Sequence, residues 1–219
     1  MNDVPVLKSS RARNSKGKVA NAAVLAAATR LFAERGYDGV SIADVAAASG
    51  VAKPSVLYHF TDKETLWKSA VEALWAEVDA FFEDRWPRST PPSRELLEGM
   101  LELFIEASIR WPAYVRIPFI EGATPSWRSE WLVDRHFGQH VLTTDRILRA
   151  MQRRGLVGNG DPAHYQALMT SSINVFIAQS AMWSRTYSRD LSDAESLRAT
   201  MKLILDLMVK NPLSDRTDK

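Results

Sequence analysis

Apolar residues recur at helical spacing along the chain, and Pro, Gly and capping residues fall between the apolar runs. No stretch shows the two-residue alternation of apolar and polar positions that is typical of a half-buried strand. The pattern therefore predicts an all-α fold of about nine helices. From their start and stop signals, the expected helices cover 19–36, 41–49, 52–60, 62–86, 93–111, 112–122, 124–154, 162–187 and 192–211.

The stretch from Ser41 to Phe60 predicts two short helices joined by a tight turn. Ser41 can cap the first helix, and Asp44 can accept a hydrogen bond from the backbone N–H of Ser41, which together form a capping box. Gly50 suits a turn that requires positive φ. Two short helices with such a turn between them are typical of a helix-turn-helix.

The second helix of this pair has a polar face and an apolar face. The expected apolar anchors are Val56, Leu57 and Phe60. The polar side chains are Lys53, Ser55, Tyr58 and His59, and no acidic residue occurs from 53 to 61. Such a face suits phosphate oxygens and base edges.

A second capping box, at Thr61 and Glu64, is expected to open the long helix that follows, with Lys63 also facing DNA. We expect phosphate contacts from Ser41, Lys53, Tyr58, His59 and Lys63, with Ser55 and its neighbours at the bases.

The segment from about 19 to 67 resembles the tetracycline-repressor (TetR) family of bacterial transcription regulators. The resemblance lies in LFAERGYDGVS, IADVAAASGV, KPSVLYHF and DKETL, in this order and spacing. One departure is Ala52, because many members have Ser or Thr there, at the expected N-cap; Pro54 partly compensates, since its fixed φ suits a first turn. The resemblance implies that helices 1–3 bind DNA, that helices 4–7 enclose a small-molecule pocket, and that the last two helices form a dimer.

On this basis the chain divides into four parts. They are a flexible basic N-terminal arm (1–18), a three-helix helix-turn-helix DNA-binding domain (19–63), a helical ligand-binding and dimerisation domain (64–211) and a C-terminal tail (212–219). Residues 1–63 carry a net charge of +4 and the remainder −2. The arm contains Lys8, Arg11, Arg13, Lys16 and Lys18, which suit the DNA backbone or a minor groove; the alternative is a solubilising tail.

The last two predicted helices favour a homodimer. The penultimate helix has small residues that allow close helix approach, namely Ser171, Ser172, Ala178, Ser180 and Ala181. The final helix has an apolar stripe of Leu197, Met201, Ile204, Leu205 and Met208. The alternative is that these stripes cover a core within the chain.

An apolar or aromatic small-molecule effector is expected in the second domain. The candidate ligand-binding residues are Trp75, Phe104, Ser108, Trp111, Tyr114, Trp131 and Asn174. An aromatic residue at helical spacing also serves ordinary packing, whereas Asn174 lies in the apolar run INVFIA and needs a hydrogen-bond partner if it is buried. Arg116 and Arg128 could bind a carboxylate or lie on a solvated surface.

The sequence predicts neither an enzyme nor a metal site. Cysteine is absent, and there is no GxSxG motif and no phosphate-binding glycine loop. His136 and His140 have the spacing of two metal ligands, but two ligands do not make a site. Neither a signal peptide nor an apolar run of membrane-spanning length is visible, so we expect a cytoplasmic protein without cofactors or membrane contact.

The favoured interpretation is a dimeric transcriptional repressor that binds a palindromic operator on double-stranded DNA and is released by a small-molecule effector. The alternative is a helical small-molecule-binding protein or enzyme whose helix-turn-helix is only structural.

Overall fold

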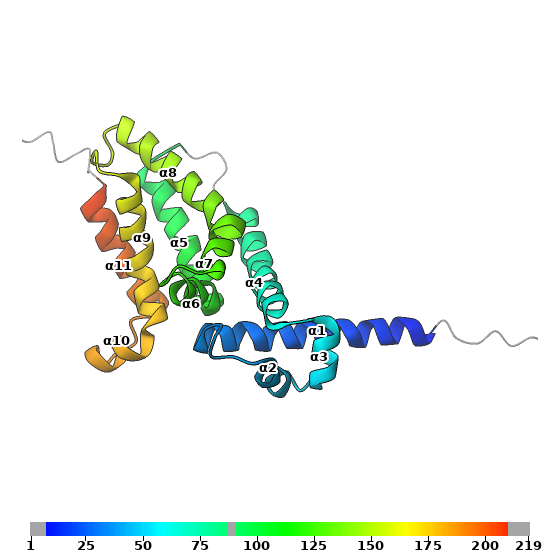
Figure 1. Ribbon diagram of the computed structural model, residues 1–219. Coiled ribbons are helices and arrows are strands. Elements are labelled where there is room, and N and C mark those ends of the chain that lie inside the picture. Colours follow the sequence, from blue (N-terminus) through cyan, green and yellow to red (C-terminus); the bar gives the residue numbers. More distant parts are fainter. Residues whose placement is uncertain (1–7, 87–90, 210–219) are drawn as a thin grey trace, which may run out of the picture. The chain divides into compact units, whose positions relative to one another are not determined.

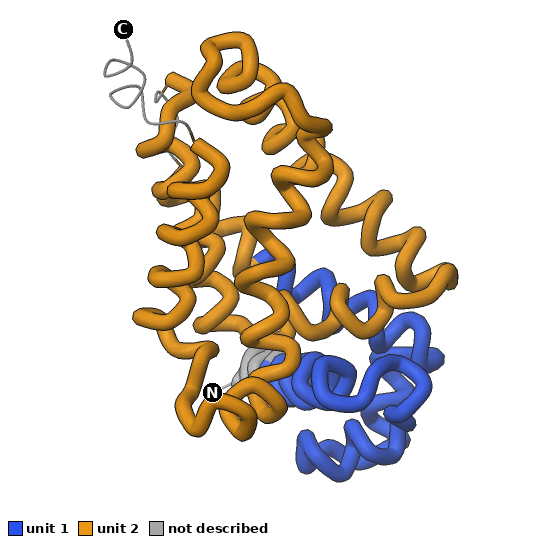
Figure 2. The backbone as a smooth tube through the Cα atoms, turned by 90° about the vertical axis from the view of Figure 1, so that its left-hand side faces the viewer, with its two compact units in different colours: residues 1–76 blue, residues 77–219 orange. Residues whose placement is uncertain are grey.

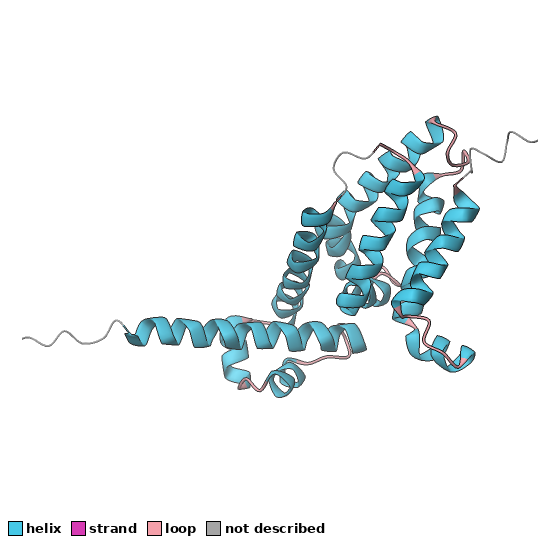
Figure 3. Cartoon of the chain, turned by 180° about the vertical axis from the view of Figure 1, so that it is seen from behind, coloured by secondary structure: helices cyan, strands magenta, loops and turns pink. Residues whose placement is uncertain are grey.

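The computed structural model describes residues 8–86 and 91–209, with side chains described from residue 19 onward (Figure 1). The described part is helical and contains no strand, apart from an isolated bridge between Val157 and Val209 (Figure 3). The elements are α1 (Lys8–Arg35), α2 (Ile42–Ser49), α3 (Lys53–His59), α4 (Lys63–Arg85), α5 (Arg94–Arg110), α6 (Pro112–Glu121), α7 (Trp127–Leu132), the π-helical η1 (Val133–Phe137), α8 (Gly138–Arg153), α9 (Pro162–Ala178), α10 (Ser180–Tyr187) and α11 (Ala194–Met208). The expected all-α fold is confirmed.

The chain forms two compact units, residues 1–76 and 77–219 (Figure 2). The boundary falls inside α4, whereas the sequence placed it between 63 and 64. The first turns of α4 belong to the first unit because Trp67 and Ala70 are fully buried there. In addition, the Thr29 hydroxyl of α1 donates a hydrogen bond to the carbonyl of Ala70 at 3.3 Å.

In the first unit, glycines end α1 and α2. Gly36 and Gly50 have φ of 68° and 69°, the left-handed conformation that favours glycine. Helix α1 buries an apolar stripe that includes Val24, Ala27, Ala28, Leu31 and Phe32. Helix α1 begins at Lys8, so residues 8–18 are helical and the flexible arm expected over 1–18 is wrong for that stretch. Residues 1–7 lie outside the described residues.

We expect opposite effects on stability from two glycine substitutions. At Gly50 an added Cβ meets nothing, but positive φ costs an L-residue about 1 kcal/mol or more, so Gly50→Ala should lower the free energy of unfolding. At Gly99, inside α5, an added Cβ also meets nothing, so Gly99→Ala should raise it by about 0.5–1 kcal/mol. Urea titrations followed by circular dichroism measure both; shifts of the same sign would contradict the backbone argument.

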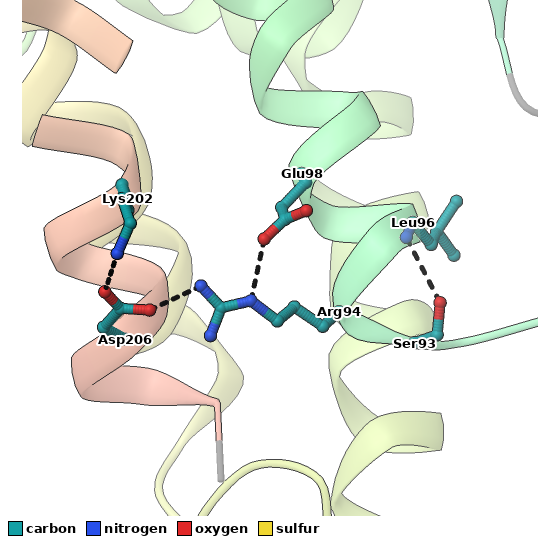
Figure 4. Close-up of polar contacts among 6 residues, drawn as sticks. All are labelled: Ser93, Arg94, Leu96, Glu98, Lys202 and Asp206. Atoms are coloured by element: carbon teal, nitrogen blue, oxygen red, sulfur yellow. Dashed lines mark hydrogen bonds and ion pairs between the residues drawn. The ribbon is translucent and has the colours of Figure 1, made fainter. Parts of the chain in front are cut away.

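In the second unit, α5, α8, α9 and α11 pack around a shared apolar core. The Ser93 hydroxyl caps α5 by accepting a hydrogen bond from the N–H of Leu96, at the position where the sequence predicted this helix to start. At the same end, Arg94 joins α5 to α11: its Nε donates to Glu98 at 2.7 Å, and its Nη2 donates to Asp206 at 2.5 Å (Figure 4). Exposed pairs of this kind contribute little to stability, so the core, rather than Arg94, holds the two helices together.

Two predicted helices are interrupted, so the nine expected helices become eleven α-helices among the described residues. The helix expected over 124–154 contains η1, where the N–H of Gly138 donates to the carbonyl of Val133. The helix expected over 162–187 ends at Ala178, and Gln179 separates α9 from α10. The sequence does not predict either interruption, because Leu132 and Gln179, where the helices break, are neither Pro nor Gly.

Two helices are capped after the residue at which the sequence predicted them to start. The helix expected from 124 begins as α7, which is capped by Ser126 in a capping box with Ser129. The helix expected from 192 begins as α11, which is capped by Asp193; its side chain accepts a hydrogen bond from the N–H of Ser196 at 2.7 Å. Ser192 instead donates its hydroxyl to Asp190. Helix α9 starts at Pro162, as expected, and is capped by Asp161.

The stripe that was expected to form the dimer packs within the chain. Leu197, Leu205 and Met208 are buried in the core of the second unit, and Met201 and Ile204 are packed against it. The apolar residues that α11 leaves exposed are Leu203 (60%) and Leu207 (78%). For Leu197, Leu205 and Met208 the alternative interpretation, a core within the chain, is therefore correct, because helical periodicity identifies an apolar face but not what covers it. The tail expected over 212–219 lies outside the described residues.

Candidate nucleic-acid interface and candidate ligand cavity

Helix α3 is fixed by two anchors on one side. Val56 and Phe60 are buried, while the predicted DNA-contacting residues Lys53, Ser55, Tyr58 and His59 are exposed. Tyr58 is 83% exposed and packs edge-on against His59, with ring centroids 5.2 Å apart. Leu57 was expected to be a third anchor, but it is 39% exposed, because two anchors at i and i+4 already define the buried side of so short a helix.

The cap of α2 matches the sequence prediction. The Ser41 hydroxyl accepts a hydrogen bond from the N–H of Asp44 at 3.2 Å, and Asp44 Oδ2 accepts one from the N–H of Ser41 at 2.8 Å. Hydrogen bonds from Ser41 hold the pKa of the Asp44 carboxyl below its usual value. Because the Ser41 hydroxyl also donates to Asp44 at 2.6 Å, its predicted phosphate contact requires an exchange of partner.

Helix α3 starts without a side-chain cap, as the alanine at position 52 implied. The carbonyl of Ala52 accepts hydrogen bonds from the N–H groups of Ser55 and Val56, at 2.8 and 3.1 Å. Pro54 occupies the first turn, where a missing N–H leaves no intrahelical bond unmade. The N-terminal end of α3 therefore presents only small or basic side chains.

The start of α4 differs from the prediction. Asp62, rather than Thr61, caps the helix, because its Oδ1 accepts a hydrogen bond from the N–H of Thr65 at 2.6 Å. That hydrogen bond is the main reason why the pKa of the Asp62 carboxyl is lowered. The Thr61 hydroxyl instead lies 3.4 Å from the Thr65 hydroxyl.

Lys63 is held by a residue that the sequence prediction missed. Its ammonium nitrogen lies 4.2 Å from the ring centroid of Tyr37, a cation–π distance. Tyr37 in turn stacks on Phe32 and meets Trp67 edge-on. The only signal for Tyr37 was its position directly after the C-terminal Gly36 of α1, which indicates a packing residue rather than a support for Lys63.

The second unit contains a partly enclosed, mainly apolar cavity of about 280 Å³. Of the predicted ligand-binding residues, Phe104, Tyr114 and Asn174 line it. The other lining residues are Phe82, Trp86, Leu97, Met100, Leu101, Phe137, His140, Val141, Thr144, Gln166, Met169 and Thr170. None of the lining residues is Asp, Glu, Lys or Arg, so the cavity suits an uncharged apolar or aromatic group.

Four predicted ligand-binding residues do not line this cavity. Trp75 and Ser108 are fully buried in packing positions. Trp111 donates its Nε1 hydrogen to Glu77 at 2.9 Å, and Trp131 packs edge-on against His136 at 5.1 Å. Each of these aromatic residues has a packing role, which was the alternative interpretation of the sequence. The sequence prediction missed the α8 residues that line the cavity. The apolar face of an amphipathic helix can be read from the sequence, but the element or cavity that this face contacts cannot.

Asn174 and Tyr114 supply the polar chemistry of the cavity wall. Asn174 Oδ1 is buried and accepts no hydrogen bond from any described residue. Burial raises the pKa of the Tyr114 hydroxyl, and the negative charge of Asp79 raises it further, so Tyr114 is a neutral hydroxyl near pH 7. An incoming donor would satisfy Asn174 without displacing a bond within the chain.

The two arginines near this region have partners within the chain. Arg116 lies 3.5 Å from the carbonyl of Ile177, at the end of α9, and 3.4 Å from the Ser180 hydroxyl. Arg128 pairs with the buried carboxylate of Glu121. Both arginines therefore connect elements of the second unit, and Arg128 already pairs with a carboxylate of the chain itself.

Comparisons with known proteins place the chain among bacterial regulators. Residues 24–70 match the family model described as "Bacterial regulatory proteins, tetR family". The chain is 25% identical over 200 residues to the HTH-type transcriptional regulator EthR of Mycolicibacterium smegmatis, covering 90% of this chain and 86% of EthR. It is 31% identical over 114 residues to the HTH-type transcriptional regulator RutR of Escherichia coli K12, covering 50% and 49% of the two chains.

A solved structure supports the fold over most of the chain. The fatty acid degradation regulator FadR from Bacillus halodurans superposes with a TM-score of 0.63 at 16% identity, covering 85% of this chain and 94% of that one. At this identity the likeness shows the fold alone. The relatives are transcription regulators and not enzymes. No helix in the described ranges is both long and apolar enough to cross a membrane.

Proposed function

The chain belongs to the TetR family of bacterial regulatory proteins, and on that premise we propose that it is a dimeric, ligand-responsive repressor that binds a palindromic operator in the cytoplasm. The observation that carries the proposal is the exposed face of α3. Lys53, Ser55, Tyr58 and His59 project from a short helix, and no acidic residue lies from 53 to 60. A face of this kind suits insertion into a major groove.

The proposed DNA contacts divide into two kinds. Ser55, near the N-terminal end of α3, is placed to reach base edges, as recognition helices do with their first turns. Lys53, Tyr58, His59 and Lys63 are proposed to contact phosphates and so fix the position of α3 in the groove. The cation–π contact with Tyr37 would hold Lys63 in place, which lowers the entropy cost when it meets a phosphate.

A second copy of the chain would complete the operator-binding protein. Leu203 and Leu207 are exposed on one side of α11, and Leu168 is exposed on α9, which packs against α11. Large apolar side chains left exposed on neighbouring helices are typical of a protein–protein interface. A two-fold interface through α9 and α11 would present two α3 helices to successive major grooves.

Effector binding in the cavity is proposed to release the operator through α4. This single helix carries Lys63 at its first turn and Phe82, which lines the cavity, near its end. A ligand that fills the cavity would press on Phe82 and tilt α4, which would change the separation of the two recognition helices and weaken operator binding. A cognate ligand that binds tightly and leaves operator affinity unchanged would contradict this mechanism.

The test is recovery of genomic fragments by the purified protein at about 150 mM salt, where nonspecific electrostatic binding is weakened. We expect enrichment of a fragment set that shares an inverted repeat, because a two-fold dimer reads two half-sites. Footprinting should then protect both half-sites. Recovery of random fragments alone would contradict the proposed function.

A further inference from the structure

A second hollow adjoins the apolar cavity within the second unit. Its volume is about 580 Å³, and it is open to solvent. It shares four lining residues with the apolar cavity, namely Phe82, Trp86, His140 and Thr144. We call the apolar cavity the inner chamber and this second hollow the outer chamber. Because they share residues of α4 and α8, the two chambers adjoin.

The charge of the two chambers differs. The lining of the inner chamber includes no Asp, Glu, Lys or Arg. The outer chamber is lined by the carboxylates of Asp79, Glu83 and Asp134 and by a single guanidinium, that of Arg135. An excess of carboxylates around a partly enclosed hollow attracts a cation, because low-dielectric walls concentrate the field.

Asp79 is a carboxylate of the outer chamber that lies beside His140, one of the shared lining residues. Its Oδ1 is buried and accepts no hydrogen bond from the residues that the structure describes, whereas the side chain as a whole is 44% exposed and His140 Nε2 lies 3.5 Å from Oδ1. The carboxylate therefore keeps contact with solvent, and Oδ1 can still accept a hydrogen bond from a ligand. The negative charge of Asp79 also raises the pKa of the Tyr114 hydroxyl in the inner chamber, which places Asp79 within electrostatic range of both chambers.

Aromatic rings lie at the junction of the two chambers. The ring centroid of Phe82 lies 6.3 Å from those of Trp86 and His140 and 6.4 Å from that of Tyr114. Ring faces attract cations, and the attraction increases when the cation is desolvated. A positively charged group at this junction would have both a carboxylate and aromatic faces beside it.

Resting on the proposed function, we propose that the effector is an amphipathic cation, whose protonated amine lies against Asp79 in the outer chamber and whose uncharged apolar or aromatic body fills the inner chamber. The amine donates to Asp79 Oδ1, and a donor on the ligand body can pair with Asn174 Oδ1. A carboxylate ligand is disfavoured, because carboxylates outnumber the single guanidinium in the lining of the outer chamber. This assigns a charge to one end of the mainly apolar effector that the sequence predicted.

The test uses a panel of primary amines with aromatic or branched apolar bodies, each with its matched alcohol and carboxylate. Titration calorimetry on the full-length protein should show at least one amine binding about tenfold or more tighter than its alcohol, as expected for a charge-assisted hydrogen bond. Its carboxylate should bind most weakly. Equal affinities for amine and alcohol, tightest binding of a carboxylate, or no binding by any amine at millimolar concentration would overturn the proposal.

Two variants localise the charge. Asp79→Asn preserves the shape of the side chain and should remove most of the amine's advantage over the alcohol, while the affinity for the alcohol changes by less than about twofold. Asp134→Asn should reduce the advantage by a smaller factor. Glu130→Gln removes a charge from an exposed position on α7 outside both chambers and should leave the amine preference unchanged. An unchanged preference in Asp79→Asn would overturn the assignment.

Operator binding is measured separately so that the two proposals can fail independently. If an amine binds through Asp79 but leaves operator affinity unchanged, the ligand class stands and its role as an effector is wrong. If the protein binds an inverted repeat and is released only by neutral or anionic ligands, the regulator stands and the cationic class is wrong.

Discussion

Lys53→Ala and Tyr58→Ala should each abolish operator binding without changing the fold. Both side chains are exposed on α3, and neither contributes to the buried anchors Val56 and Phe60. Removing a charge-assisted hydrogen bond costs about 1.5–3 kcal/mol, and in a dimer each substitution acts in both half-sites, so affinity should fall by at least about a hundredfold. Electrophoretic mobility shifts with the recovered operator measure the decrease.

The salt dependence distinguishes the two substitutions. Lys53→Ala removes a cation that is proposed to neutralise a phosphate, so it should reduce the slope of log affinity against log salt by about 0.9 per half-site. Tyr58→Ala removes no charge and should leave the slope unchanged. Arg149→Ala, which removes an exposed cation of α8 in the second unit, serves as the charge-matched control. Unchanged operator affinity in both α3 variants would favour a helix-turn-helix that is only structural.

The helix-turn-helix could be predicted because its signals are local. The capping box of Ser41 and Asp44, the positive φ of Gly50 and the anchors Val56 and Phe60 each depend on neighbours within one or two turns. Leu57 was misplaced because a seven-residue helix has too few positions for its periodicity to define a face. The support of Lys63 by Tyr37 was missed because the two residues meet only after α1 and α4 pack together.

The ligand cavity could be predicted only in part, because its walls come from helices far apart in the sequence. Asn174 stood out since a polar side chain in an apolar run requires an explanation, and its Oδ1 is indeed buried without a partner among the described residues. Trp111 and Trp131 had the same sequence signal as Phe104, yet only Phe104 lines the cavity. Tertiary packing, which spacing does not encode, decides between filling a core and lining a hollow.

At two helix starts, adjacent residues could each have served as the N-cap. Thr61 and Asp62 are both capping residues, as are Ser192 and Asp193, and in each pair the aspartate caps the helix. The negative charge of an aspartate interacts favourably with the positive end of the helix dipole, whereas a neutral hydroxyl lacks this charge interaction. Local rules therefore located each of these two helix starts to within one residue but did not rank adjacent candidates.

Double substitution of Leu203 and Leu207 by glutamate should convert the proposed dimer into a folded monomer that no longer binds the operator. Both side chains are exposed in the single chain, so their replacement leaves no cavity in the core. At a two-fold interface, however, each copy would bring two carboxylates into an apolar contact, where unpaired buried charge is strongly unfavourable. Analytical ultracentrifugation measures the oligomeric state, and circular dichroism measures the fold.

A matched variant separates the interface from general surface charge. Val133→Glu adds a carboxylate at an exposed apolar position on η1, outside α9 and α11, and should leave the dimer intact. If the α11 variant remained a dimer, the proposed interface would be wrong even if the protein bound DNA. If it became a monomer but kept full operator affinity, two-fold binding would be wrong, because a lone α3 reads only one half-site. Loss of both properties together is expected, since each half-site alone supplies only part of the binding free energy.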